Sequence, residues 1–204
     1  MEYSLPPFIF VEICVRYMEN RFINEILSIY SKIDVQVEAF RSAVKLHCLS
    51  GCGICCTSTK VEANAIELLP LAQELFHRGE AEFWMERAQA AHYEGACIFY
   101  DPKPQRMAIG HCRFYAWRPS VCRLFGFSKV KDKTGKPKLA ACIIQKNIMP
   151  YVIEKAEKSV SHGMHYPGLT NFFLQIMGMT HQAVLCQLTE RFTWHLRNTV
   201  WKFK

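Results

Sequence analysis

Hydrophobic residues near the start of the chain recur every three or four positions, which is the spacing of one face of an α-helix. The first series predicts a helix over residues 8–30, entered after Pro6 and Pro7. Its apolar positions are Ile9, Ile13, Tyr17, Phe22, Ile23, Ile26, Leu27 and Tyr30. A second series predicts a helix from about Asp34 to His47, with Val37, Phe40, Val44 and Leu46 on its apolar face. Two helices therefore lead the chain toward Cys48.

The pattern between residues 59 and 95 predicts two more helices. Thr59 and Glu62 stand at the spacing of a capping box, so a helix should begin near Lys60. Pro70 should kink or break this helix because a proline removes a backbone donor and clashes with the preceding turn. A further helix is predicted over residues 80–93.

Beyond residue 96 the pattern changes to short apolar runs separated by turn residues. Short strands are predicted over residues 97–100, 107–109, 125–130 and 138–144, the last two forming a hairpin around residues 131–137. The helical pattern then returns over residues 148–160 and roughly 169–200.

These elements predict a mainly α fold with a small, loop-rich β-hairpin region around a cysteine-ligated metal site. We expect a single domain over residues 1–204. Its core would be residues 45–145, flanked by the helical segments 1–44 and 146–204.

Cysteine usage narrows the function classes, since the chain has ten cysteines in 204 residues. The N-terminus lacks the basic region and cleavage site of a signal peptide, and the apolar run from Phe8 to Val15 is too short to span a bilayer. We therefore expect a cytoplasmic protein whose thiols stay reduced, so metal binding or thiol redox chemistry is favoured over disulfides. The formal net charge of +7 permits an acidic partner without requiring one.

Four of these cysteines form a compact cluster: Cys48, Cys52, Cys55 and Cys56. Four more follow at Cys97, Cys112, Cys122 and Cys142. Thiolate sulfur selects zinc, copper(I) or iron–sulfur clusters over hard cations, so all eight are candidate metal ligands. Gly51 and Gly53 let the backbone turn tightly between them. Two groups of four sulfurs suit either one large site with spare thiols or two four-ligand sites.

The adjacent pair Cys55-Cys56 is the most diagnostic feature of the cluster. Neighbouring side chains on an extended backbone point to opposite faces, so one of the two could serve a second metal or act as a redox thiol. His47 and His111 each adjoin a cluster cysteine. Each could be a metal ligand or a neighbour that donates a hydrogen bond to a ligand.

Arginines and aromatic residues surround the second group of cysteines, between Cys112 and Phe125. Thiolate ligands give a site negative charge, and an arginine is always protonated and offers several donors. We therefore predict that Arg118 and Arg123 neutralise the site or bind an anion.

Taken together, these motifs resemble the cysteine-cluster (YkgJ-like) family, which is described as zinc- or iron-chelating. The resemblance rests on Gly51-Cys52-Gly53-Ile54-Cys55-Cys56, Cys97-Ile98-Phe99-Tyr100, Cys112-Arg113-Phe114-Tyr115 and Arg118-Pro119-Ser120-Val121-Cys122-Arg123-Leu124-Phe125. It covers about residues 45–145. It implies that the ligands are Cys48, Cys52, Cys55, Cys56, Cys97, Cys112 and Cys122. Cys142 is added here because it is a further reduced thiol. The family includes flagellin lysine methylases, which are iron–sulfur proteins, but membership alone does not transfer an activity.

Three function classes follow. A [4Fe-4S]-type iron–sulfur protein with a redox, sensing or protein-modification role leads, because so many thiolates exceed the needs of one structural zinc. The alternatives are a protein in which Zn²⁺ stabilises an interaction module, and a thiol redox protein using Cys55-Cys56. A protein partner or an anionic ligand is expected, and nucleic acid is not indicated. The basic and aromatic residues 190–204 are interpreted as a terminal helix docked on the core. No acid–base pair is identifiable, so no catalytic residue is assigned.

Overall fold

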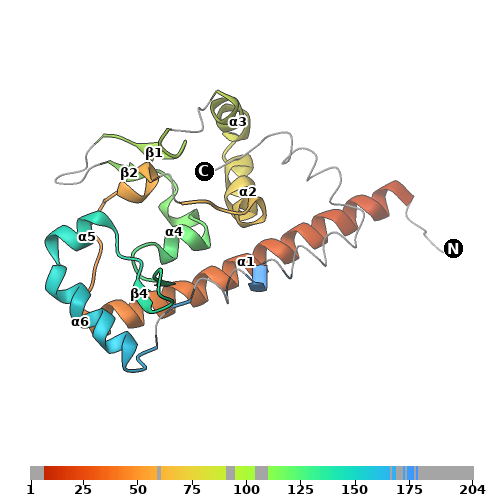
Figure 1. Cartoon of the computed structure of the whole chain (residues 1–204). Helices are drawn as coiled ribbons and strands as arrows, with labels where there is room; N and C mark the ends of the chain where they lie inside the picture. Colours follow the sequence, from red (N-terminus) through yellow and green to blue (C-terminus); the bar gives the residue numbers. More distant parts are fainter. Residues whose placement is uncertain are drawn as a thin grey trace.

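A computed structural model describes residues 7–58, 61–90, 95–103, 110–165, 167, 168, 172, 174–176 and 178. The structure is mainly helical with two small two-stranded antiparallel sheets, which confirms the predicted fold class (Figure 1). The helices are α1 (Pro7–Val44), α2 (Leu69–His77), α3 (Ala81–Gln89), α4 (Ser120–Leu124), α5 (Ile143–Ile148) and α6 (Pro150–Ser161). Three short 3₁₀ helices are η1 (Ile54–Thr57), η2 (Ala65–Leu68) and η3 (Tyr115–Trp117). The strands are β1 (Tyr100–Asp101), β2 (His111–Cys112), β3 (Lys129–Lys131) and β4 (Pro137–Leu139).

The first element is one helix of 38 residues, so the predicted break between two N-terminal helices is wrong. Its buried side chains form one unbroken stripe at alternating spacings of three and four: Ile23, Ile26, Tyr30, Ile33, Val37, Phe40 and Val44. Ile33 fills the position at which the prediction placed the break. Since neither glycine nor proline occurs between residues 8 and 50, nothing in the sequence interrupts the helix. The helix ends before His47, because Lys45 adopts a left-handed conformation with φ of 61°.

The following helix begins later than predicted. Residues 59 and 60 lie outside the described residues, and residues 61–64 form no regular element. The capping box that the structure does contain joins Asn64 to Glu67 and starts η2. Pro70 does not break a helix, because it lies in the first turn of α2, where its missing N–H is not needed.

Both sheets are shorter than predicted. Strand β1 pairs with β2 antiparallel, with Tyr100 opposite Cys112, while residues 107–109, the predicted partner strand, lie outside the described residues. The hairpin of β3 and β4 is confirmed, with Lys129 opposite Leu139. The predicted helix over residues 148–160 is observed as α6, and α5 precedes it. Most of the predicted helix over residues 169–200 lies outside the described residues, including residues 190–204.

Two hydrophobic clusters organise the described residues. The larger lies along α1 and includes Leu124 of α4, Leu139 of β4 and Ile153 of α6. In Figure 1, α4, β4 and α6 lie along the C-terminal half of α1, and α2 and α3 lie on the side of α4 that faces away from α6. The smaller is aromatic and is built from Leu71, Leu75, Trp84, Phe99 and Phe114. Among the described helices, none combines the length and the apolar character that crossing a membrane requires.

Candidate metal centre

The loop that carries the first four cysteines is held by its own backbone. Gly51 has a φ of 70°, a left-handed conformation that glycine adopts without strain, and the Cys52 N–H donates to the Leu49 carbonyl at 3.1 Å. The Cys56 N–H donates to the Gly53 carbonyl at 2.8 Å within the turn that forms η1. The chain therefore tightens into a short helical turn at the vicinal pair.

Glycine is required where this loop meets the first sheet. A Cβ on Gly53 would lie 2.9 Å from the backbone N and Cα of His111, closer than side chains pack. Gly110 has a φ of 62°, and a Cβ there would clash with the Asp101 carbonyl oxygen. Gly53 lets β2 pass directly against η1, and Gly110 lets β2 pass against β1. The Cys97 N–H also donates to the Cys56 carbonyl at 2.7 Å, so Cys97 and Cys112 are brought beside the first cluster.

Four thiols meet around Cys56. Its side chain hydrogen-bonds to those of Cys112, Cys55 and Cys97, and the resulting preference for the protonated form raises the pKa of Cys56. The same hydrogen bonds lower the pKa of Cys97 and of Cys112. The hydrogen bond from Cys56 also lowers the pKa of Cys55 to about 7. We call Cys55, Cys56, Cys97 and Cys112 the inner thiols.

Two further thiols, Cys122 and Cys48, lie within electrostatic reach of the inner thiols. Burial raises the pKa of Cys122, and Cys55, Cys97 and Cys112 raise it further. Burial also raises the pKa of Cys48 to about 11, with added contributions from Cys52, Cys142 and Cys55. Cys55 is therefore the inner thiol that also acts on Cys48, and we call Cys48, Cys52 and Cys142 the outer group.

Cys142 is the most buried of the eight candidate cysteines, and its thiol takes part in a hydrogen bond that caps a helix. It caps α5 by accepting the Gln145 N–H at 3.4 Å, and the Gln145 side chain accepts the Cys142 N–H at 2.9 Å. Gly126 makes room for the Gln145 side chain, because a Cβ there would lie 2.6 Å from Oε1. Cys142 therefore belongs to the outer group while serving as a helix cap.

Arg118 faces the thiols. Its positive charge opposes the raised pKa of Cys48 and of Cys122 and lowers the pKa of Cys55 and of Cys112. The guanidinium stacks on the Tyr115 ring at 3.8 Å, which is a favourable cation–π distance. Its buried Nε has no hydrogen-bond partner among the described residues.

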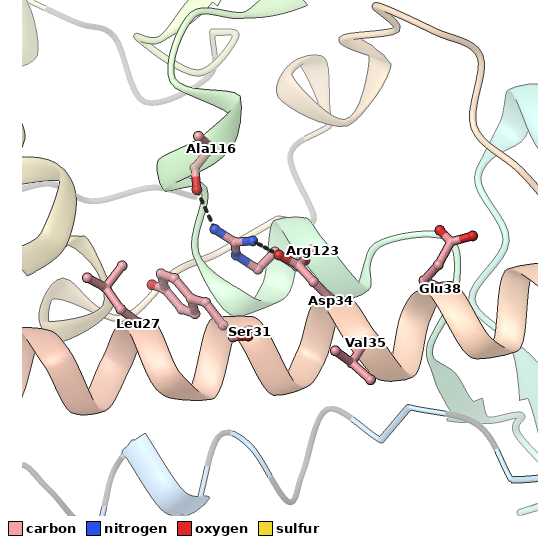
Figure 2. Close-up of a pocket in the computed structure, with 8 residues that line it drawn as sticks. Leu27, Ser31, Asp34, Val35, Glu38, Ala116 and Arg123 are labelled. Carbon is pink, nitrogen blue, oxygen red and sulfur yellow. Dashed lines mark hydrogen bonds and ion pairs between the residues drawn. The ribbon is translucent and has the colours of Figure 1, made fainter.

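Arg123 lies on the other side of α4. Its guanidinium pairs with Asp34 of α1, donates to the carbonyls of Ala116 and Arg118, and lies 4.5 Å from the Tyr30 ring centroid (Figure 2). Both arginines were predicted to neutralise the site or bind an anion, and both roles stay predictions. The donors of Arg123 are engaged by Asp34 and by two backbone carbonyls.

The two histidines differ in their surroundings. His47 is exposed on the loop after α1. His111 is half-buried in β2 opposite Asp101, with its backbone packed against Gly53. Their predicted roles as ligands or neighbours stay predictions.

Glu67 and Ser120 position the site and were not anticipated from the sequence. The Glu67 side chain is buried and accepts the Ser120 N–H at 3.0 Å and the Ser120 hydroxyl. It also accepts the Asn64 N–H at 3.1 Å within the capping box. The spacing Asn64-x-x-Glu67 also fits a capping box, but the prediction assigned the capping box to Thr59 and Glu62.

The thiols are gathered but not yet convergent. Across the described residues, no three histidine, cysteine, aspartate or glutamate side chains are arranged to close on one metal ion as they stand. The eight candidate cysteines are free thiols. Protonated thiols hydrogen-bond to one another, whereas a metal binds thiolates, so ligation requires these protons to leave.

Comparison with known families agrees with this donor set. Residues 47–143 match the model of the CxxCxxCC family, described as a putative zinc- or iron-chelating domain. This match agrees with the resemblance noted in the motifs. All eight candidate cysteines fall within the matched residues. Neither a curated protein nor a solved structure matches the chain.

Proposed function

We propose that this CxxCxxCC domain binds a [4Fe-4S]-type iron–sulfur cluster through its thiolates and uses it in a redox, sensing or protein-modification role. The observation that supports the proposal is that cysteines from both halves of the motif lie beside one another, with the Cys97 N–H hydrogen-bonded to the Cys56 carbonyl at 2.7 Å. Cys55 and Cys56 of η1 meet Cys97 and Cys112 in one hydrogen-bonded group, with Cys122 beside them.

The residues fit such a group chemically. Thiolate sulfur is the ligand that iron–sulfur clusters require, and four thiolates would bring a large negative charge into a half-buried region. Arg118 supplies a compensating positive charge, and its unpaired buried Nε is a donor suited to a sulfur or another anion. The inner thiols are the proposed ligands. Cys122, Cys48, Cys52 and Cys142 are the proposed reserve from which an exchanged or additional ligand is drawn.

When bound, an iron–sulfur cluster supplies one-electron redox chemistry at a potential set by its surroundings. This chain sets those surroundings with its own residues. Cys97 and Cys112 pack against the aromatic cluster of Trp84, Phe99 and Phe114, which excludes water from one side. Arg118 adds a fixed positive charge near the thiols, which would favour the more reduced, more negatively charged state of the cluster.

Zinc is the second candidate, and a specific observation favours it. The inner thiols number four, which is the ligand count of a closed structural zinc site. In that case the metal would hold η1, β1 and β2 together and would supply stability rather than redox chemistry. Thiol redox chemistry is the third candidate, supported by the lowered pKa of Cys55 beside its hydrogen-bonded neighbour Cys56.

We further propose a protein partner or an anionic ligand over the site, in the cytoplasm. Tyr115 is 55% exposed and stacks against Arg118, so an aromatic and a cationic group lie together beside the thiols. Aromatic residues and arginine are the side chains most enriched where proteins bind one another. The free thiols support a reducing compartment.

The test is anaerobic purification followed by analysis of iron, acid-labile sulfide and zinc, with an absorption spectrum. A brown protein with about four iron and four sulfide per chain is expected. The double variant Cys97→Ser/Cys112→Ser should lose the colour, while Cys14→Ser, which removes a thiol outside residues 47–143, should keep it. A colourless, iron-free sample with stoichiometric zinc would show that the bound metal is zinc and not iron. A metal-free sample whose thiols are reversibly oxidised and reduced in the presence of a chelator would favour thiol redox chemistry as the function.

A further inference from the structure

Helix α4 has only five residues, so its position depends on what holds it rather than on its own stability. It carries Cys122, which lies beside the inner thiols, and the preceding residues carry Arg118, which faces them. Anything that fixes α4 therefore also fixes two side chains of the proposed centre.

The first anchor of α4 is Arg123. Its side chain is only 6% exposed and is the residue next to Cys122. Nη1 pairs with the Asp34 carboxylate on α1, and Nη2 donates to the Ala116 carbonyl. Nε donates to the Arg118 carbonyl at 2.8 Å, so Arg123 also holds the backbone of the residue that faces the thiols. Figure 2 shows the guanidinium between Asp34 of α1 and the carbonyl of Ala116 in η3.

The second anchor is Glu67 of η2, which binds the first residue of α4. It accepts the backbone and hydroxyl hydrogens of Ser120, the first residue of the helix. Tyr30 of α1 joins the two anchors, because its hydroxyl donates to the Glu67 carbonyl and its ring lies under the Arg123 guanidinium. The two anchors grip α4 on either side of Cys122.

We propose that Asp34, Tyr30 and Arg123 form a clasp that positions Cys122 and Arg118 for metal binding without touching the metal. The inference rests on the proposed function, since it concerns how the proposed centre is held. It gives Arg123 a different role from Arg118: Arg123 is a positioning residue that acts through α4. The clasp also explains why a buried arginine, which is costly without partners, is accepted between α1 and α4.

The clasp can be weakened from its solvent side. Asp34 is 48% exposed and lines an open groove with Leu27, Ser31, Val35 and Glu38 (Figure 2). Asp34→Asn keeps the shape of the side chain and removes its charge. Tyr30→Phe keeps the ring under Arg123 and removes only the hydroxyl. Glu25→Gln is the matched control, because it removes a carboxylate from an exposed ion pair on the same helix, with Arg21.

The experiment measures the rate at which a chelator removes metal from the anaerobically purified protein, together with the absorption or electron paramagnetic resonance spectrum. Asp34→Asn and Arg123→Lys should lose metal about 10–100-fold faster than the wild type, the range typical of residues that orient metal ligands. Both should also show an altered spectrum, which a loss of general stability alone would not produce. Glu25→Gln should match the wild type in both measurements.

Wild-type rates and spectra in Asp34→Asn and Arg123→Lys would overturn the clasp while leaving the proposed function intact. A wild-type protein without metal would overturn both, so the two failures are distinguishable. Should Arg123→Lys fail to fold, Asp34→Asn and Tyr30→Phe carry the test. Alkylation of Cys122 in metal-free protein should then be faster, relative to Cys97, in those variants than in the wild type, and an unchanged ratio would count against the clasp.

Discussion

Cys48 and Cys55 belong to the same short segment of the chain, but the pKa values of their thiols differ strongly. Cys48 is exposed as a whole residue. Partial desolvation of its thiol, together with the neighbouring sulfurs, nevertheless raises its pKa to about 11. Cys55 is less exposed, and the hydrogen bond from Cys56 lowers its pKa to about 7. Because the thiolate is the reactive form, electrostatics and exposure make opposite predictions for which residue reacts first.

We expect iodoacetamide to label Cys55 at least about tenfold faster than Cys48 in metal-free protein at pH 7, measured by peptide mass spectrometry. The lower nucleophilicity of a low-pKa thiolate offsets only part of its larger population. Labelling of Cys55 should slow as the pH falls below 7, because the thiolate becomes protonated. The variant Cys56→Ala removes the hydrogen-bond donor and should slow Cys55 at pH 7. Faster labelling of Cys48 would show that exposure controls reactivity.

The two arginines show what the sequence can and cannot predict at a single residue. Arg118 and Arg123 both adjoin Cys122 at short spacing, so their residue types predicted one shared role. Their actual directions depend on how the short helix α4 docks on α1, through contacts with Asp34, which is 89 positions away from Arg123. Residue type and local spacing carry no record of that long-range contact.

At the scale of elements, Gly110 is the point at which β2 is fitted against β1. Its φ of 62° alone should cost an alanine about 1–2 kcal/mol. The clash of a Cβ with the Asp101 carbonyl and the Tyr100 ring adds about 1–3 kcal/mol, because backbone atoms there have no room to move. Gly110→Ala should therefore lower the free energy of unfolding well beyond the conformational cost.

Gly135→Ala is the control for that prediction. Gly135 has a φ of 81°, in the turn between β3 and β4, but a Cβ there meets no atom within 4 Å. It should show only the conformational cost of about 1–2 kcal/mol. Urea unfolding of both variants measures the difference. Equal losses would mean that β2 can shift away from β1 without penalty.

Helices with a long apolar stripe were predictable, whereas their ends were not. The stripe of α1 is continuous through Ile33, and the predicted break came from treating two apolar runs as separate elements. The β3–β4 hairpin was predictable because glycine and polar residues mark its turn. The approach of η1 to β2 was not, because Gly53 and His111 are brought together by tertiary packing and leave no local pattern.

At the scale of the whole molecule, the thiols are attached to the smaller of the two hydrophobic clusters. Cys97, Cys112 and Trp117 pack against the aromatic cluster of Trp84, Phe99 and Phe114, whose ring centroids lie 5.1–5.2 Å apart. The larger cluster lies along α1 and contains none of the inner thiols. The two parts of the fold should therefore depend on metal to different degrees.

Segments around the thiols have little regular backbone bonding of their own. Strands β1 and β2 have two residues each, while α1 is a long helix on a broad apolar cluster. Local opening is governed by how many contacts a segment must break. Metal would add bonds between η1, the segment that leads into β1, and β2, so its removal should loosen these elements first.

We expect metal removal to speed amide hydrogen exchange at least about tenfold over residues 97–103 and 110–117, and less than about twofold over residues 26–40. Hydrogen exchange followed by mass spectrometry, with and without chelator, measures both. Restoring the metal should restore protection, and Cys97→Ser should resemble the metal-free protein. The expected contrast arises because the inner thiols tie together elements that lack a core of their own size, whereas α1 keeps its packing with α4, β4 and α6. An equal rise along α1 would instead make the metal a support of the entire fold, because the clasp between Asp34 and Arg123 would then transmit the loss from α4 to α1.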